Sequence, residues 1–286
     1  MLKLKKIMNN PEQVTHADIK DICSRHNAFV YPKVRIADVF EISNSGISSR
    51  EYSFALKSHF DFTVYDKESN PLFSVEFDGP GHKEPNQMEN DELKDNLCRY
   101  FNFPLLRISY EYITNEYRNM TILGWFIETW FASKYFEEAQ ENGEIDYYEP
   151  FIASGFSYIQ GLKNKFPLCL SSNERAKMFE LFSRGHIKFY VPSVAIFKDD
   201  KKNYHSIGWI YIDDTKVAFV KENMQGQFFP TPIHELIDEL TTIKLYAHLM
   251  DVLNGKAMPI SLEELEKSIK FYNSSYSFCF GCYYKP

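Results

Sequence analysis

The stretch that decides the fold is SHFDFTVYDKESNPLFSVEFD, residues 58–78. Apolar and polar residues alternate from Ser58 to Asp66 and again from Leu72 to Asp78, which is the pattern of two half-buried strands. The polar segment between them, residues 67–70, supplies a turn. The sequence therefore predicts a β-hairpin over this stretch.

The register of this hairpin brings acidic side chains together. If the loop is closed by its flanking positions, 66 and 71, then Asp61 lies directly opposite Glu76. The same register places His59 opposite Asp78, on the same side of the ribbon. The other side then gathers the apolar residues of both strands, which are Phe60, Phe62, Val64, Phe73, Val75 and Phe77.

Two facing carboxylates need compensation, because like charges directly opposite on a sheet destabilise it by roughly 0.2 to 1 kcal/mol. A divalent cation between Asp61 and Glu76 would supply it. Hard oxygen ligands suit Mg²⁺ or Mn²⁺, which takes one or two carboxylates and completes its shell with water and phosphate oxygens. Taken alone, the same acids could also point into water from a solvated hairpin.

A helix is predicted from about residue 86 to residue 101, with a buried stripe formed by Leu93, Leu97, Tyr100 and Phe101. Asp91, Lys94 and Asp95 share an adjacent face. Their spacing of three and four residues allows them to pair with one another. An alternative is that Lys94 reaches the acidic hairpin.

The order of these elements carries a family resemblance. An acidic hairpin is followed by the loop GPGH at 79–82, a helix with D..KD at 91–95 and the apolar strand PLLRIS at 104–109. This order resembles the PD-(D/E)XK nuclease superfamily. More narrowly, residues 12–113 look like the branch related to very-short-patch repair endonucleases and its uncharacterised bacterial relatives. The resemblance implies an α/β fold with a restriction-endonuclease-like core, a mixed sheet flanked by helices.

The resemblance also assigns roles to single residues. Asp61 and Glu76 match the first and second metal-binding acids. The superfamily usually has lysine two positions after the second acid, whereas this chain has Asp78, which we place with the other two acids as a metal-binding and catalytic residue. Lys94 is the natural substitute for the lysine. His82 is a second catalytic candidate, or a residue that stabilises its glycine-containing loop.

The family often donates a further acid from an N-terminal helix, predicted here from about Thr15 to Ser24. Asp18 is the candidate. Its alternative role is helix capping together with Thr15.

The resemblance implies a metal-dependent endonuclease that hydrolyses phosphodiester bonds, with DNA favoured over RNA, in prokaryotic defence, restriction or repair. The net charge of −7 fits this poorly, because proteins that grip nucleic acid usually show a basic footprint. The alternative is a catalytically inactive module that keeps the fold and acts with a protein partner.

The rest of the chain predicts a helix over residues 115–139 and a boundary in the acidic segment 140–146. We expect a nuclease domain over 1–140 and an α+β domain over 147–286, which could select targets, dimerise or bind a partner protein. The predicted elements of the second domain are helices 172–183, 233–254 and 262–272 and strands 188–197, 206–212 and 217–221. The cluster formed by His234, Glu235 and Asp238 is assigned to structure.

Composition sets the remaining bounds. A chain of 286 residues with 44% hydrophobic residues can bury real cores. No apolar run of about 18 residues predicts a membrane span, and no signal peptide is indicated. The odd number of five cysteines favours a reducing compartment, so we expect a cytoplasmic protein. The lone CxxC at 279–282 is expected to be incidental in an aromatic tail.

Overall fold

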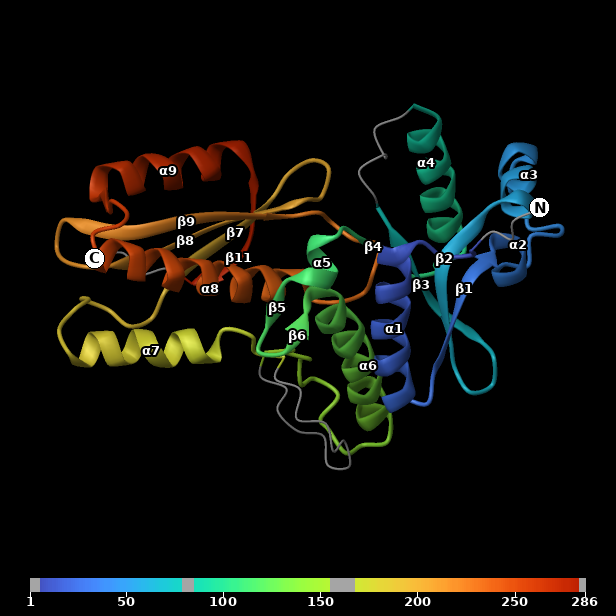
Figure 1. Cartoon of the computed structure of the whole chain (residues 1–286), viewed down its shortest axis with the longest axis horizontal. Helices are drawn as coiled ribbons and strands as arrows, with labels where there is room; N and C mark the ends of the chain where they lie inside the picture. The colour runs from blue at the N-terminus through green and yellow to red at the C-terminus, as the bar shows by residue number, and fades with distance from the viewer. Residues whose placement is uncertain (1–5, 79–84, 155–167, 283–286) are drawn as a thin grey trace. The chain divides into compact units, whose positions relative to one another are not determined.

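The computed structural model describes residues 6–78, 85–154 and 168–282 (Figure 1). The chain divides into two compact units, each with a sheet of its own. The first unit contains Met1–Ile145 together with Gln227–Thr231, and the second contains Asp146–Gly226 together with Pro232–Pro286. No pattern in the sequence indicates that residues 227–231, so late in the chain, belong to the first unit.

The first unit is built on a mixed sheet with the strand order β1-β2-β3-β4. Its strands are β1 (Phe29–Arg35), β2 (His59–Tyr65), β3 (Pro71–Phe77) and β4 (Leu105–Ile108). The first three strands pair antiparallel, and β4 pairs parallel to β3. The predicted α/β class with a mixed sheet flanked by helices is confirmed.

Among the described residues of this unit, the helices are α1 (Asn10–Arg25), α2 (Ile36–Val39), α3 (Ser49–Lys57), α4 (Pro85–Tyr100), α5 (Glu111–Thr114) and α6 (Ile122–Glu141). Helices α1 and α6 lie on one side of the sheet and α2, α3 and α4 on the other (Figure 1). A small hairpin, β5 (Glu116–Tyr117) and β6 (Met120–Thr121), precedes α6, so that helix begins later than the predicted residue 115. The side chain of Thr121 caps it by accepting the Gly124 N–H at 3.0 Å.

The hairpin of β2 and β3 has the predicted register in its middle. Phe62 pairs with Val75, Thr63 with Ser74 and Val64 with Phe73. The predicted closure at positions 66 and 71 is wrong, because the register shifts and Tyr65 pairs with Pro71.

The side chain of Asp66 explains this shift. Its Oδ1 accepts the Asn70 N–H at 2.7 Å, and its own N–H donates to Asn70 O at 3.0 Å. Ser69 adopts φ +68° inside the loop. Asp66 therefore closes the turn onto Asn70, one residue earlier than expected.

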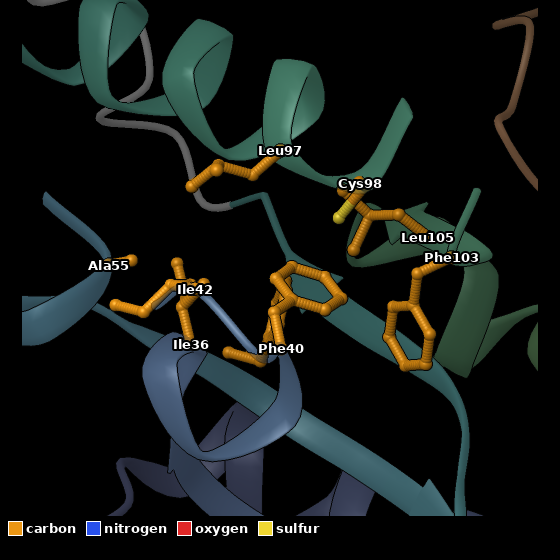
Figure 2. Packing of buried hydrophobic residues seen from close by; sticks show 9 residues of the cluster. Ile36, Phe40, Ile42, Ala55, Leu97, Cys98, Phe103 and Leu105 are labelled. Carbon is orange, nitrogen blue, oxygen red and sulfur yellow. The ribbon is translucent and has the colours of Figure 1, made fainter. Parts of the chain in front are cut away.

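Helix α4 contributes to a buried cluster on its side of the sheet. Figure 2 shows Leu97 and Cys98 pointing from α4 toward Ile42 and Phe40. The Phe60 ring joins this cluster, with its centroid 5.8 Å from that of Phe40.

Two predicted positions differ from this packing. Tyr100, expected in the buried stripe of the helix, is 58% exposed, and its hydroxyl donates to Ser45 O at 2.5 Å. Phe60 and Phe62 were expected on one face, yet Phe60 packs with α4 whereas the Phe62 ring lies 6.0 Å from His16 of α1. The alternation breaks at Asp61, between them.

The segment 227–231 completes the first unit at the outer edge of its sheet. Leu105 N–H donates to Phe228 O at 2.8 Å, which extends the hydrogen bonding beyond β4. The Phe229 ring is buried against Phe73, at 5.2 Å, and against Phe126 of α6, at 6.2 Å. This segment supplies both backbone partners and core to the first unit.

The second unit has a five-stranded antiparallel sheet with the order β10-β9-β8-β7-β11. The strands are β7 (Ser193–Lys198), β8 (Tyr204–Tyr211), β9 (Lys216–Met224), β10 (Ile260–Ser261) and β11 (Ser277–Cys282), and the helices are α7 (Ser172–Ser183), α8 (Ile233–Leu253) and α9 (Leu262–Ser275). One cluster joins α9 to the sheet through Leu265 and Trp209, and another joins α7 and α8 to it through Met178, Leu245 and Ile210.

All predicted helices and strands of this unit are present, although the first strand begins at Ser193 rather than at residue 188. Strands β10 and β11 were not predicted, and an aromatic tail was expected where β11 lies. The acids of α8 do structural work: Glu235 accepts the N–H groups of Ala153 and Ser154 at 3.1 and 2.9 Å, and Asp238 binds Arg175 at 2.6 Å. Within the described ranges, no helix is both long and apolar enough to cross a bilayer.

We expect Phe229→Ala to destabilise the first unit by about 3 to 5 kcal/mol, because it removes a buried ring from the core. Hydrogen exchange of the β3 and β4 amides would report this as loss of protection. Phe228→Ala is the control, since that side chain is 38% exposed and only its carbonyl bonds to β4. Equal protection in the two variants would show that the segment is not part of this core.

Candidate active site

Asp61 and Glu76 lie where the β2–β3 ladder ends. Backbone pairing stops at Phe62 and Val75. Beyond that pair, Asp61 N–H donates to Glu76 Oε1 at 3.1 Å, and Phe77 N–H donates to Asp61 Oδ2 at 2.9 Å. Each carboxylate therefore binds an amide of the other strand in place of a ladder hydrogen bond, and this fixes both acids at one point.

Two lysines bind the remaining oxygens of this acidic pair. Lys94 Nζ of α4 lies 2.6 Å from Glu76 Oε2 and 3.1 Å from His59 O. Lys33 Nζ of β1 lies 2.6 Å from Asp61 Oδ1 and 2.9 Å from Glu12 Oε1. The two lysines supply the charge compensation that was expected from a metal ion. Charge repulsion in the hairpin by itself therefore does not require a cation.

These groups line a cleft of about 420 Å³ in the first unit. Its walls come from α1, β1, α3, β2, β3 and α4. The lining residues are Glu12, Lys33, Phe54, Ser58, His59, Asp61, Glu76, Phe77, Gln87, Asn90, Asp91 and Lys94.

Glu76 is the most buried acid of the cleft, with 5% of its surface exposed. Burial raises the pKa of Glu76 to about 7, against the lowering effect of the Lys94 ammonium, and the neighbouring Asp61 raises it further. Without a bound cation, this carboxyl therefore holds its proton up to near-neutral pH.

Asp78, expected to be a third metal ligand, has a different partner. Arg107 of β4 donates from Nη1 to Asp78 Oδ1 at 3.0 Å, and it also binds Asp91 at 3.3 Å and Asp95 at 2.9 Å. In the described ranges, no group of three or more His, Cys, Asp or Glu side chains is arranged to hold a metal ion. Asp78 is thus paired with Arg107 in this structure, and its role as a third metal ligand stays a prediction.

Arg107 also separates the polar residues of α4 into two groups with different partners. Asp91 and Asp95 turn to this guanidinium, whereas Lys94 turns to Glu76. The expected local pairing among the three helix residues is thus replaced by two separate contacts with the sheet. No role was expected for Arg107, because only the fold brings it to its acids, which lie in two segments: Asp78 directly after β3, and Asp91 and Asp95 in α4.

Two histidines, His59 and His82, belong to the region of the predicted site. His82 lies outside the described residues. His59 is exposed at the start of β2 and lines the cleft, where its backbone carbonyl accepts the Lys94 hydrogen bond.

The N-terminal helix does supply an acid, but Glu12 rather than Asp18 lines the cleft. The reason is the helix start: α1 begins at Asn10, not near Thr15, and Asn9 caps it. Glu12 N–H donates to Asn9 Oδ1 at 2.9 Å, and Asn9 N–H donates to Glu12 Oε2 at 2.8 Å. This capping box was legible in the sequence as Asn followed three residues later by Glu. No sequence signal marks Lys33.

Comparison with known proteins adds one similarity. Residues 4–122 match a family described as "Protein of unknown function (DUF2726)". That stretch contains every residue named above as lining the cleft, so the chain is similar to this family over its whole candidate site. No curated protein and no solved structure matches the chain.

We expect the carboxyl of Glu76 to titrate near pH 7 in metal-free protein, as measured by ¹³C NMR in the presence of EDTA. Lys94→Met should raise this pKa, because the ammonium opposes the effect of burial. Lys57→Met, an exposed lysine of α3, should leave it unchanged.

The raised pKa of Glu76 also determines how the stability of the folded protein changes with pH. Between about pH 4.5 and 7 the folded protein holds a proton on Glu76 that the unfolded chain has lost, so this group's contribution to stability falls as the pH rises through that window. A titration midpoint near the ordinary value of a glutamate would contradict the burial argument.

Proposed function

We propose that the first unit is a divalent-metal-dependent nuclease that hydrolyses phosphodiester bonds, in DNA rather than RNA. One observation carries the proposal: Asp61 and Glu76 are fixed together in a cleft, with Lys94 Nζ 2.6 Å from Glu76. These residue types are the acids and the lysine of the PD-(D/E)XK superfamily, which the sequence resembles. Lys94 would take the role of the lysine that Asp78 replaces.

The overall arrangement supports a restriction-endonuclease-like core. The acids lie on adjacent antiparallel strands of a mixed sheet, and the lysine comes from the helix that follows them. DNA is preferred on the family resemblance.

The donor set fits Mg²⁺ or Mn²⁺. Asp61 and Glu76 offer hard carboxylate oxygens, and a magnesium ion usually takes one or two of these. Glu12 is a third acid in the same cleft and would hold a water molecule of the metal's shell. When bound, such an ion polarises the phosphate and lowers the pKa of its water.

The protein's own groups would position and stabilise the reacting atoms. The N–H groups of Asp61 and Phe77 orient the carboxylates before substrate arrives, so no reorganisation is needed at that point. The Lys94 ammonium is only 11% exposed, and in such a partly dry site it would strongly stabilise negative charge developing on the phosphate.

The net negative charge of the chain affects how tightly it can bind a nucleic-acid substrate. With a net charge of −7 and an acidic cleft, the chain would hold nucleic acid weakly by itself. We propose that the second unit helps through a protein partner or a second copy of the chain. A prokaryotic role in defence, restriction or repair fits the family resemblance, and a cytoplasmic setting fits the cysteine usage.

We expect the purified chain to cut supercoiled plasmid DNA with Mg²⁺ or Mn²⁺ but not with EDTA. Asp61→Asn and Glu76→Gln should each lower the rate about a hundredfold or more, because the metal loses a ligand, and Lys94→Met should lower it by a similar factor. Glu92→Gln, an exposed carboxylate on the same helix as Lys94, is the matched control and should leave the rate unchanged. Single-stranded DNA and RNA tested in parallel would establish the substrate class.

Two results would count against this proposal. Full activity in Asp61→Asn and Glu76→Gln would place the chemistry elsewhere. No cutting by the native chain under any metal, together with calorimetric Mg²⁺ binding that Asp61→Asn abolishes, would favour the catalytically inactive binding module.

Metal affinity should depend on pH with a definite sign. Because Glu76 must lose its proton to bind a cation, Mg²⁺ affinity should fall as the pH drops below about 7, by up to tenfold per pH unit, and should level off above it. Calorimetric titrations between pH 5.5 and 8 would show this, together with proton release on binding. An affinity that does not vary over that range would exclude Glu76 as a ligand.

A further inference from the structure

We propose that Lys33 is an exchangeable counter-ion: its ammonium stays on Asp61 in the metal-free protein and must leave that carboxylate when a divalent cation binds. The inference rests on the proposed function in one respect, since it takes Asp61 to be a metal ligand. It adds a residue that sets metal affinity without belonging to the metal's ligand shell.

The first support is competition for one oxygen. Asp61 Oδ2 accepts a backbone donor, the Phe77 N–H, at 2.9 Å, whereas the donor on Oδ1 is the side chain of Lys33, so Oδ1 is the oxygen whose donor a cation can displace. Lys33 Nζ lies 2.6 Å from that oxygen. A magnesium ion approaches its ligands to about 2.0–2.1 Å. Two cations so close together repel strongly in a partly buried site, so either the ammonium or the metal ion occupies Oδ1.

The second support is the backbone of Lys33. It has φ +54° in the middle of β1, between the pairs Pro32–Phe62 and Val34–Phe60. A residue with a side chain rarely adopts this left-handed conformation inside a strand, and such outliers cluster at functional sites. From this conformation the side chain reaches both Asp61 and Glu12.

The third support is the contrast with Lys94. The side chain of Lys94 is 11% exposed, contacts a backbone carbonyl as well as Glu76, and lies over the Phe60 ring at 5.8 Å. Lys33 is 29% exposed, and both of its ion partners face the cleft. Lys94 is therefore held in place, whereas Lys33 can swing into water when its partner is taken.

The test is calorimetric titration of the full chain with Mg²⁺ alone at pH 8, comparing the native protein with Lys33→Met, Lys33→Gly and Lys57→Met. Removing the competing ammonium should tighten Mg²⁺ binding about tenfold in both Lys33 variants. Lys33→Gly guards against misfolding, because glycine adopts a positive φ readily. Lys57 is exposed and directly precedes Ser58 of the cleft, so Lys57→Met removes a nearby charge without breaking a contact with Asp61; its affinity should stay within about twofold of the native value.

A second readout uses the native chain. The ¹⁵Nζ signal of Lys33, identified by its absence in Lys33→Met, should be protected from solvent exchange in EDTA and lose that protection as Mg²⁺ is added. A signal unchanged at saturating Mg²⁺ would overturn the inference.

The outcomes separate this inference from the proposed function. Equal Mg²⁺ affinity in the native chain and both Lys33 variants would overturn the counter-ion role and leave the nuclease proposal standing. Tighter binding in the Lys33 variants without cleavage of any nucleic acid would support the counter-ion role and count against the enzyme. Absence of Mg²⁺ binding in every protein would overturn both.

Discussion

The candidate site depends on the reciprocal hydrogen bonds between the carboxylates of Asp61 and Glu76 and the amides of the neighbouring strand. Burying two like charges side by side is costly unless each oxygen finds a donor. Here each does: Asp61 binds the Phe77 amide and Lys33, and Glu76 binds the Asp61 amide and Lys94. The acids can lie together only because the β2–β3 ladder stops just before them and leaves its amides free for side chains.

The charges around this pair are organised into separate sets, each with its own centre. Lys33 forms an ion pair with Asp61 and Lys94 with Glu76, whereas Arg107 forms ion pairs with Asp78, Asp91 and Asp95. This separation explains how one face of α4 can carry Lys94, which binds Glu76, together with Asp91 and Asp95, which bind Arg107.

The central residues of the site, Asp61, Glu76 and Lys94, could be predicted from the sequence, whereas most of the contacts around them could not. The assumed loop closure predicted the pairing of Phe62 with Val75, although the loop itself closes one residue earlier, and the family resemblance suggested Lys94. What was missed depends on single local or distant contacts. The turn shifts because Asp66 captures Asn70, and α1 starts early because Asn9 and Glu12 cap it. Asp78 is drawn to Arg107, whose position opposite Glu76 in the parallel β3–β4 pair has no local signature. The placement of the Lys33 side chain depends on a left-handed backbone conformation, which the residue types of this strand do not predict.

The placement of Lys94 also depends on residues far outside the stretch similar to the family of unknown function. The side chain of Gln227 makes two hydrogen bonds with the backbone of Arg107. Its Oε1 accepts the Arg107 N–H at 2.9 Å, and its Nε2 donates to the Arg107 carbonyl at 3.1 Å. Arg107 in turn holds α4 through Asp91 and Asp95, and that helix carries Lys94. A contact between positions 120 residues apart therefore supports the geometry of the cleft. Because residues 227–231 are bracketed in sequence by β9 and α8 of the second unit, the first unit cannot be complete when cut from the chain at residue 145. The chain must therefore run through β7, β8 and β9 of the second unit before it returns to complete the first unit.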